Sequence, residues 1–300
     1  MATPQNIAVF GLGSMGFGMA CSLLKAGHDV HGFDLVDAPV ERFVAKGGKH
    51  AAIADVAANL DIAVVVVLNA PQTESVLFGA QGIVSKMRAG SCIIACATMP
   101  PDTARAFSAR CTEAGVLYLD APISGGSVKA ASGQLSVMAA GRAAAFEAAQ
   151  PALDAMAETV FKMGDAPGPG SAMKSVNQLL AGVHIAAMGE AMTFGMQQGI
   201  TAQQIVDVIT ASAGNSWMFG NRAPHVVDGD YTPHSAIDIW LKDLGIVLDV
   251  ARSEKFSAPL AAVALQQFTA ASGSGLGRED DAAVAKVYAR NCGLELPGDA

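Results

Sequence analysis

One lysine in a long apolar stretch is the residue of this sequence best suited to acid–base chemistry. Lys174 is the only charged residue between Asp165 and Glu190, and the amides Asn177 and Gln178 follow it within one helical turn. Helical spacing puts the lysine and both amides on one face. Desolvation lowers the pKa of a lysine towards neutrality, and the neutral amine then accepts a proton from an alcohol. The alternative is an exposed lysine whose amine reaches water, and spacing alone leaves the two interpretations open.

A serine and two glycines after a predicted strand form a second candidate, this time for binding. Ser124, Gly125 and Gly126 follow an apolar run that ends near Leu119. Successive backbone amides freed by small residues make an anion-binding concavity, and the serine hydroxyl adds a donor. A carboxylate is the expected guest, because open α/β sheets bind ligands at the carboxyl ends of their strands. A flexible surface loop is the alternative that composition allows equally well.

A glycine-rich turn near the amino terminus predicts a dinucleotide site. It follows the first apolar run and consists of Gly11, Leu12, Gly13, Ser14, Met15 and Gly16. This GxGxxG pattern permits a tight turn, brings the backbone close to a pyrophosphate and directs helix amides at it. Asp34 lies about 20 residues further on, where a carboxylate accepts hydrogen bonds from ribose hydroxyls and repels a 2′-phosphate. The expected cofactor is therefore NAD, although the same residues could form only a turn and a helix cap.

Strands and helices alternate through the first half of the chain and predict the scaffold that positions these residues. The expected strands are Ile7–Phe10, Asp29–Phe33, Ile62–Leu68, Ser91–Ala95, Val116–Leu119, Leu135–Ala139 and Glu158–Met163. The expected helices between them include Met15–Ala26, Pro101–Ala114 and Ala143–Met156. Such alternation predicts a Rossmann-type, doubly wound parallel sheet with helices on both faces.

From Ser171 onward the pattern is helical almost throughout. The expected helices are Met173–Gln198, Ala202–Ala211, Ile237–Lys255, Ala258–Ser272 and Ala282–Asn291. A turn-rich segment at Gly164–Gly170 separates the two patterns. The sequence therefore predicts an NAD-binding Rossmann domain over residues 1–165, followed by an all-α domain over residues 166–300 for substrate binding and oligomerisation.

Composition excludes several functional classes. The net charge of −8 argues against a nucleic-acid surface, although a pocket can still be locally positive. The five scattered cysteines include no CxxC pair, which predicts reduced thiols rather than disulfides or a zinc site. The histidines form no recognisable ligand pattern with acids or cysteines, so no metal is expected. We predict a cytoplasmic protein, since no signal peptide or membrane span is recognisable.

Four segments together resemble the β-hydroxyacid dehydrogenase family, which includes 3-hydroxyisobutyrate dehydrogenase and tartronate semialdehyde reductase. These segments cover Gly11–Ala20, Asp120–Gly126, Gly168–Gln178 and Trp240–Leu244, in order along essentially the whole chain. The resemblance implies that Lys174 is the catalytic base and that Ser124, Gly125 and Gly126 bind the substrate carboxylate. Asn177, and with it Gln178, would orient the lysine and the substrate.

The resemblance also assigns roles that spacing alone does not. Thr98 matches a threonine near the nicotinamide end of the cofactor, and Leu68 and Asn69 belong to a turn that contacts the cofactor. Lys242, which Asp243 follows, matches a lysine that reaches towards cofactor and substrate. Without the resemblance, Lys242 and Asp243 could equally be solvated charges on a helix.

Two departures from the family pattern fall in the expected substrate pocket. Gln178 stands where many members have a second asparagine, and Lys129 stands where a glycine is common. An additional long amide and a second lysine suit a substrate with more hydroxyl groups. The pattern most resembles the branch that oxidises C2 of L-threonate, a four-carbon polyhydroxy acid. The expected activity is therefore NAD-dependent oxidation of a small hydroxy acid, with this substrate preferred.

Alternative functions remain at this point. Within the family, 3-hydroxyisobutyrate dehydrogenase and tartronate semialdehyde reductase would use the same machinery. A non-catalytic NAD-binding protein is a different class, against which the combination of Lys174, Ser124 and Asn177 argues. An apolar helical region rich in alanine and methionine predicts a homodimer or homotetramer, with no membrane and no nucleic-acid partner.

Overall fold

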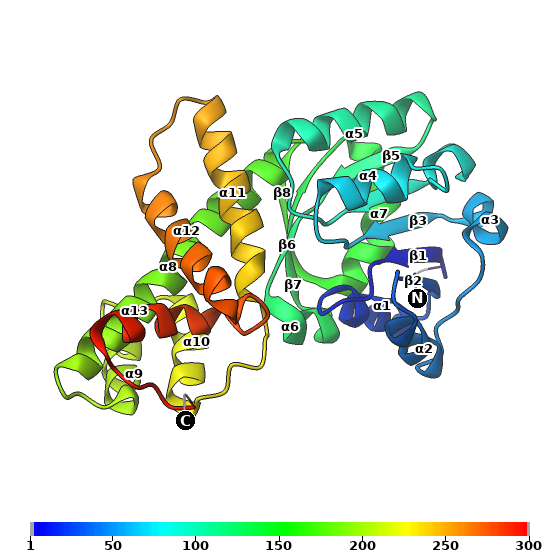
Figure 1. The fold of residues 1–300 in the computed structure, drawn as a ribbon. Coiled ribbons are helices and arrows are strands. Elements are labelled where there is room, and N and C mark those ends of the chain that lie inside the picture. The colour runs from blue at the N-terminus through cyan, green and yellow to red at the C-terminus, as the bar shows by residue number, and fades with distance from the viewer. Residues whose placement is uncertain (1–2, 299–300) are drawn as a thin grey trace. The chain divides into compact units, whose positions relative to one another are not determined.

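The computed structural model describes residues 3–298, and the chain forms two compact units, Met1–Lys174 and Ser175–Ala300. The predicted domain boundary, after residue 165, lies shortly before the division at Lys174 and stays a prediction. The first unit contains an 8-stranded sheet in the order β2-β1-β3-β4-β5-β7-β6, with β8 paired to β7 (Figure 1). The strands are β1 (Asn6–Phe10), β2 (Asp29–Phe33), β3 (Ile62–Val65), β4 (Cys92–Ala95), β5 (Leu117–Asp120), β6 (Ile123–Ser124), β7 (Leu135–Ala140) and β8 (Ala157–Gly164).

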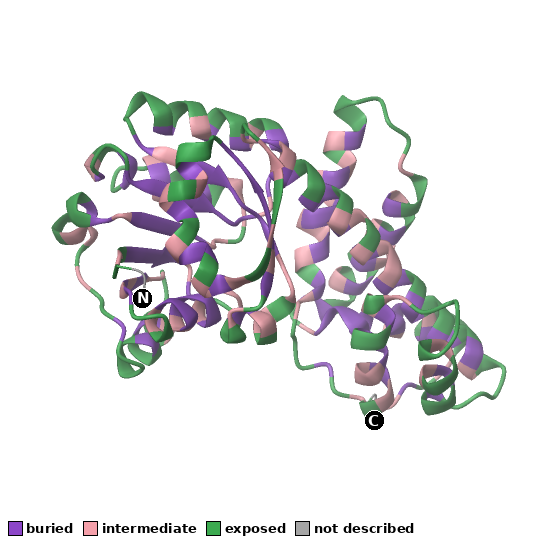
Figure 2. Ribbon diagram, turned by 180° about the vertical axis from the view of Figure 1, so that it is seen from behind, coloured by how far each residue is buried: buried purple, intermediate pink, exposed green. Residues whose placement is uncertain are grey.

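Helices cover both faces of this sheet, because every strand in its centre is apolar on both sides. In β1, Ile7 and Val9 pack into one core cluster, whereas Ala8 and Phe10 pack into another. Successive side chains of a strand point to opposite faces, so two separate clusters are the expected result. Figure 2 shows the buried residues concentrated along these strands. The predicted doubly wound Rossmann fold is thereby confirmed.

The helices of the first unit occupy the positions that the strand connections require. α1 (Gly16–Lys25), α2 (Asp37–Ala45) and α7 (Ala143–Met156) supply residues to the first cluster. α4 (Ala70–Phe78) and α5 (Pro101–Glu113) supply the second. The remaining short helices are α3 (Ile53–Val56), η1 (Ala57–Asn59), η2 (Val84–Lys86) and α6 (Gly126–Ser132).

One end of the sheet differs from an all-parallel arrangement. β7 is antiparallel to both β5 and β6, and β8 then runs parallel to β7. The two-residue strand β6 is absent from the sequence prediction, because its periodicity is too short to recognise. Its position matters, because β6 ends at Ser124, directly before Gly125 and Gly126.

The second unit is helical, as the sequence predicts. α8 (Pro169–Gln197) continues into it, and the helices that follow are α9 (Ala202–Thr210), α10 (Trp217–Asp228), α11 (Ile237–Ser253), α12 (Pro259–Ala271), η3 (Ser272–Leu276), η4 (Asp281–Val284) and α13 (Ala285–Cys292). Its core includes Ile185 and Met192 from α8 together with Trp240 and Phe268. Sequence periodicity misses α10, because Pro224 and Gly220 interrupt it. Among the described residues, α8 is the one helix long and apolar enough to span a membrane, with 44% of its most apolar window buried in the protein.

Three of the cysteines are expected to resist thiol reagents in the folded protein. Burial raises the pKa of Cys92, Cys96 and Cys111 to about 12. A rise in pKa from 9.0 to about 12 lowers the thiolate fraction about a thousandfold, and only the thiolate reacts. A chromogenic disulfide reagent should therefore modify the exposed Cys292 first and all five thiols only after denaturation. Cys292→Ser should remove the fast phase; a fast phase that persists in this variant would contradict the assignment.

Candidate active site

The carboxyl ends of neighbouring strands gather the residues expected to bind a cofactor. Gly11 follows β1, Asp34 follows β2, Asn69 lies beyond the end of β3, and Thr98 lies beyond the end of β4. These strands are adjacent and parallel, in the order β2-β1-β3-β4. Their carboxyl ends share one edge of the sheet, where doubly wound folds bind nucleotides. The next strand, β5, ends at Asp120, which precedes the expected substrate loop.

The glycine-rich turn has the backbone geometry that a pyrophosphate requires. Gly11 has φ +94°, and a Cβ on it would lie 2.7 Å from the carbonyl oxygen of Val66. A Cβ on Gly16 would lie 1.8 Å from the carbonyl oxygen of Gly11, so the helix start packs directly on the turn. At Gly13, by contrast, a Cβ would meet no described atom within 4 Å. The turn therefore needs two glycines for packing, and the third leaves open space through which a phosphate can approach the backbone.

The start of α1 adds amide donors to this open space. Within residues 3–298 no side chain caps this helix end, and its first turn contains no acidic residue. Ser14 is exposed and Met15 is half-buried, directly before the helix. Uncapped amides at a helix start attract a phosphate. The residues present therefore fit a dinucleotide.

Asp34 is held in place by the turn that it helps to form. Its Oδ2 accepts a hydrogen bond of 2.7 Å from the amide of Leu12, and its Oδ1 accepts one of 3.0 Å from the amide of Val36. A carboxylate has about four lone-pair sites, so these two bonds leave capacity for ribose hydroxyls. The Leu12 side chain is fully buried, which fixes the position of its amide. Asp34 is therefore pre-oriented at the edge where the cofactor is expected.

The turn after β3 has a structural role that the sequence prediction did not include. Asn69 caps α4, since its Oδ1 accepts a 2.9 Å hydrogen bond from the amide of Gln72. The amide of Leu68 donates to Oε1 of Gln72 at 2.9 Å, while the Leu68 side chain is half exposed. Thr98 is partly buried. Contact of these residues with the cofactor stays a prediction.

Lys174 is buried, and its amine lies beside the expected substrate loop. The residue is 9% exposed, and its Nζ donates a 2.9 Å hydrogen bond to the carbonyl oxygen of Ile123. Ile123 and Ser124 form β6, so the amine lies against the strand that begins the serine–glycine segment. An exposed lysine that reaches water is thus excluded. The geometry suits a proton acceptor held next to a bound substrate.

The serine–glycine segment itself needs glycine. Gly125 has φ +135° and Gly126 has φ +78°, conformations that other residues rarely adopt. A Cβ on Gly125 would lie 3.0 Å from Cδ of Lys129, so the lysine stem packs against this turn. The amine of Lys129 pairs with Oε2 of Glu158 at 3.5 Å. A substrate-binding role for Lys129 stays a prediction, since in the structure its charge is shared with a glutamate.

A buried carboxylate anchors the start of α8, and sequence reasoning missed it. Oδ2 of Asp120 accepts hydrogen bonds from the amides of Gly168 and Ser171, at 2.8 and 2.9 Å, and Oδ1 accepts one of 2.6 Å from the Ser171 hydroxyl. Burial raises the pKa of Asp120, and the Ser171, Gly168 and Gly170 hydrogen bonds oppose the rise. Because Lys174 lies in the first turns of α8, Asp120 fixes the base of the helix that carries it. An acid at the end of a fully apolar strand was the signal available in the sequence.

The second unit contains a connected set of polar groups. Nδ2 of Asn177 donates to Oε1 of Gln178 at 2.9 Å, and Nε2 of Gln178 donates to Oδ2 of Asp243 at 2.5 Å. The amine of Lys242 lies 2.8 Å from Oδ1 of Asp243. Gln178 and Asp243 are buried, at 7% and 3% exposed. The structure therefore links all four of these expected residues, and the glutamine that departs from the family pattern makes the central contact.

A cavity elsewhere in the first unit does not coincide with these residues. It has a volume of about 440 Å³ and is lined by Asn6, His31, Asp55, Val56, Ala58, Asn59, Leu60 and Arg88. Asn6 begins β1 and Leu60 precedes β3, so the cavity lies at the amino ends of the strands, opposite the predicted cofactor edge. Arg88 forms an ion pair with Asp61 beside it.

Comparison with known families assigns both parts of the chain. A model of the NAD-binding domain of 6-phosphogluconate dehydrogenase matches residues 6–164. A model described as the NAD-binding region of NADP-dependent 3-hydroxyisobutyrate dehydrogenase matches residues 168–288. The two matches follow each other along the chain, as the sheet and the helical unit do.

Individual relatives match over nearly their whole length. The chain is 52% identical to the L-threonate dehydrogenase of Cupriavidus necator, with 99% of each chain covered. It is 48% identical to the L-threonate dehydrogenase of Haemophilus influenzae, with 97% of each covered. Among solved structures, it resembles a 3-hydroxyisobutyrate dehydrogenase of Salmonella typhimurium, with 46% identity, a TM-score of 0.90, and 94% of this chain and 99% of that chain covered.

Proposed function

The chain belongs to the β-hydroxyacid dehydrogenase family of 3-hydroxyisobutyrate dehydrogenase and its relatives, and from this premise we propose that it oxidises L-threonate at C2 to 2-oxo-tetronate with NAD. That it is an NAD-dependent hydroxyacid oxidoreductase follows from its family. The observation that carries the choice of substrate is the 52% identity, over 99% of both chains, to a protein named L-threonate dehydrogenase. The linked Asn177, Gln178 and Asp243 supply amide and carboxylate groups suited to a substrate with several hydroxyls.

In this mechanism Lys174 takes the proton and the other predicted site residues hold the substrate. Bound NAD supplies the nicotinamide ring that accepts the hydride from C2. The unprotonated amine of Lys174 removes the proton of the C2 hydroxyl, so that a carbonyl group forms at C2. Ser124 and the amides of Gly125 and Gly126 bind the carboxylate of the substrate, and Asn177 and Gln178 bind its hydroxyls. Burial of the lysine favours this transfer by excluding competing water.

The substrate proposal is tested by comparing four acids under the same conditions. NADH formation would be followed with L-threonate, D-erythronate, glycerate and 3-hydroxyisobutyrate. The proposal expects the highest kcat/KM for L-threonate. A higher value for 3-hydroxyisobutyrate would instead support the activity named for the Salmonella typhimurium structure, which is 46% identical. Reduction of tartronate semialdehyde is tested in the reverse direction by following NADH consumption. If the protein turned over none of these compounds, the alternative of a non-catalytic NAD-binding protein would be supported.

Asp34 is expected to set the preference for NAD over NADP. Asp34→Ala should lower kcat/KM for NAD by about tenfold to a hundredfold, because hydrogen bonds to the ribose hydroxyls are lost. It should lower kcat/KM for NADP less, because the repulsion of the 2′-phosphate is lost too. Steady-state kinetics with both cofactors measure this change.

Two further variants separate cofactor binding by Asp34 from support of the turn. Asp34→Asn keeps an acceptor for the amide of Leu12, so the turn should persist while the charge is gone. Asp37→Ala removes an exposed acid from the first turn of the neighbouring α2 and should leave kcat/KM unchanged for both NAD and NADP. A wild-type enzyme that prefers NADP would overturn the role given to Asp34.

We further propose a cytoplasmic homodimer or homotetramer that needs neither a membrane nor a nucleic acid. The net charge of −8 argues against nucleic acid. Exposed apolar side chains such as Phe194, Val208 and Phe256 in the helical unit suit contacts between subunits. Buried Ile185 and Met188 support a role for α8 as a core helix rather than a membrane span. Light scattering that gives the mass of one chain would contradict the oligomer.

A further inference from the structure

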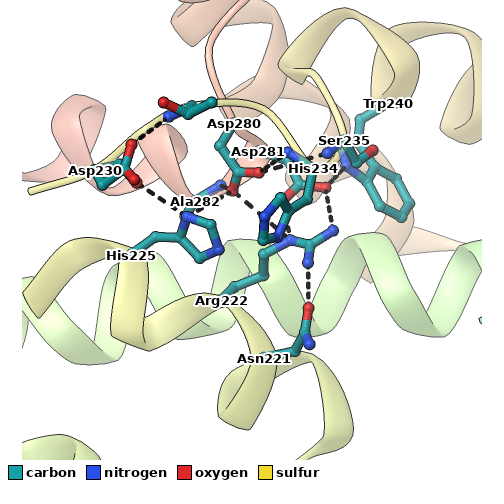
Figure 3. Close-up of polar contacts among 11 residues, drawn as sticks. Asn221, Arg222, His225, Asp230, His234, Ser235, Trp240, Asp280, Asp281 and Ala282 are labelled. Carbon is teal, nitrogen blue, oxygen red and sulfur yellow. Dashed lines mark hydrogen bonds and ion pairs between the residues drawn. The ribbon is translucent and has the colours of Figure 1, made fainter. Parts of the chain in front are cut away.

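Two histidines and an aspartate come together in the second unit, away from the residues assigned to the dehydrogenase. His225 lies on α10, His234 on the segment that leads to α11, and Asp280 directly before η4 (Figure 3). One ring nitrogen of each histidine and a carboxylate oxygen of Asp280 lie within 4.8 Å of one another. The two rings meet edge to face, with centroids 4.8 Å apart. The sequence predicts no such cluster, because distant segments supply its members.

The charges around this cluster favour an additional cation. Asp280 and Asp281 are both fully buried, and Arg222 forms an ion pair with Asp281 and lies 3.7 Å from Asp280. One guanidinium against two carboxylates leaves these three groups with one net negative charge. Buried charge that is not matched is costly, so a cation beside Asp280 would stabilise the fold.

Hydrogen bonds to the backbone hold Asp280 and His225 in place, as hydrogen bonds commonly hold the ligands of a metal ion. Oδ2 of Asp280 accepts bonds from the amides of His234 and Ser235, at 2.8 and 3.4 Å, and Oδ1 accepts one of 3.0 Å from the amide of Ala282. Oδ1, which accepts one backbone hydrogen bond, keeps lone-pair capacity for an ion. Nδ1 of His225 lies 2.9 Å from the carbonyl oxygen of Asp230. A proton on Nδ1, donated to that carbonyl, leaves Nε2 as the nitrogen with a free lone pair. Nδ1 lies 4.0 Å from Oδ1 of Asp280, so the imidazole must turn to bring Nε2 to an ion beside Asp280.

We propose that His225, His234 and Asp280 bind a divalent transition-metal ion of the zinc type. Two imidazoles and one carboxylate, completed by water, suit tetrahedral zinc. Metal–nitrogen bonds of about 2.0 Å require the ligand atoms to approach one another more closely than they do here. His234 is exposed and lies outside any helix, so it can move inward. The ion would join α10, the segment before α11 and the segment before η4, and would thereby stabilise the fold of the second unit.

The test measures metal binding to the full-length protein after treatment with a chelator, and it needs no enzymatic activity. Calorimetric titration with Zn²⁺ should show one ion per chain, accompanied by a rise in Tm. His225→Gln and His234→Gln should each weaken Zn²⁺ binding about a hundredfold and abolish the rise in Tm. Titration with Co²⁺ should give the visible absorption of a tetrahedral ion in the unsubstituted protein, and neither variant should give it.

The matched control is His184→Gln, which removes a half-buried histidine of α8 in the same unit. It should bind Zn²⁺ as the unsubstituted protein does. Circular dichroism of each variant without metal should match the unsubstituted protein, which separates loss of a ligand from loss of the fold. The proposal is overturned if saturable binding is absent up to about 1 mM Zn²⁺, or if either His225→Gln or His234→Gln binds Zn²⁺ normally.

Discussion

Lys174→Met is expected to lower kcat for L-threonate about a thousandfold while NAD affinity changes less than about threefold, since general base catalysis contributes roughly 10²–10⁴ in rate. Methionine keeps the length and apolar character of the buried stem but has no amine to take the hydroxyl proton. The glycine-rich turn and Asp34, which are expected to bind NAD, lie on other elements of the first unit. Steady-state kinetics give kcat, and fluorescence titration with NADH gives the cofactor affinity.

Lys162→Met is the matched control for this experiment. Lys162 also belongs to the first unit, but its side chain is 56% exposed and pairs with Asp165 on the surface. Its replacement should leave kcat within about twofold, because surface ion pairs contribute little. A Lys174→Met enzyme with nearly unchanged kcat would remove Lys174 from the reaction. A parallel loss of NADH binding would point to a damaged fold rather than a missing base.

Much of the fold can be predicted from the periodicity of apolar residues along the sequence alone. β1, β3 and β4 are short, apolar on both faces and separated by amphipathic helices, so a parallel sheet was predictable. The antiparallel pairing of β7 was not, because strand direction depends on how the chain returns after Asp120. α10 was missed for a different reason. Packing of Phe219 and Val226 in the core stabilises this helix in spite of its internal proline.

In the candidate site, too, some residues can be predicted from the local sequence, whereas others depend on contacts between distant parts of the chain. The glycine-rich turn and Asp34 are readable because close backbone packing demands glycine at fixed spacing, as the contacts of Gly11 and Gly16 illustrate. The environment of Lys174 was not readable, since its hydrogen bond to Ile123 joins residues 51 positions apart. The ambiguity between a buried base and an exposed lysine could therefore be resolved only by tertiary structure.

The same limit explains the polar contacts that no local pattern indicates. Gln178 and Asp243 meet although 65 positions separate them. His225 and Asp280 approach each other only because α10 packs near η4. Each contact involves a side chain whose type is common on protein surfaces. Burial, which decides whether such a group needs a partner, is a property of the assembled core.

Asp120→Ala is expected to lower the free energy of unfolding by about 3 kcal/mol and kcat/KM about a hundredfold. The alanine would leave the amides of Gly168 and Ser171 and the Ser171 hydroxyl without their acceptor in a buried place. The first turns of α8 would then shift, and Lys174 with them. Denaturant unfolding and steady-state kinetics measure the two effects. Asp102→Ala, which removes an acid that is 90% exposed, is the control and should cost less than about 1 kcal/mol.

Asp120→Asn should restore most of both losses, which distinguishes the hydrogen bonds of Asp120 from its charge. The amide oxygen can accept from both backbone amides while the amide nitrogen donates to Ser171 Oγ. Because burial raises the pKa of Asp120, the unsubstituted protein loses stability as pH rises from the ordinary aspartate range through that raised value. The asparagine variant does not ionise, so its stability relative to the unsubstituted protein should increase with pH over this range. If instead the asparagine variant loses relative stability as pH rises, the hydrogen-bond donors stabilise the carboxylate by more than burial destabilises it, and the charge itself holds α8.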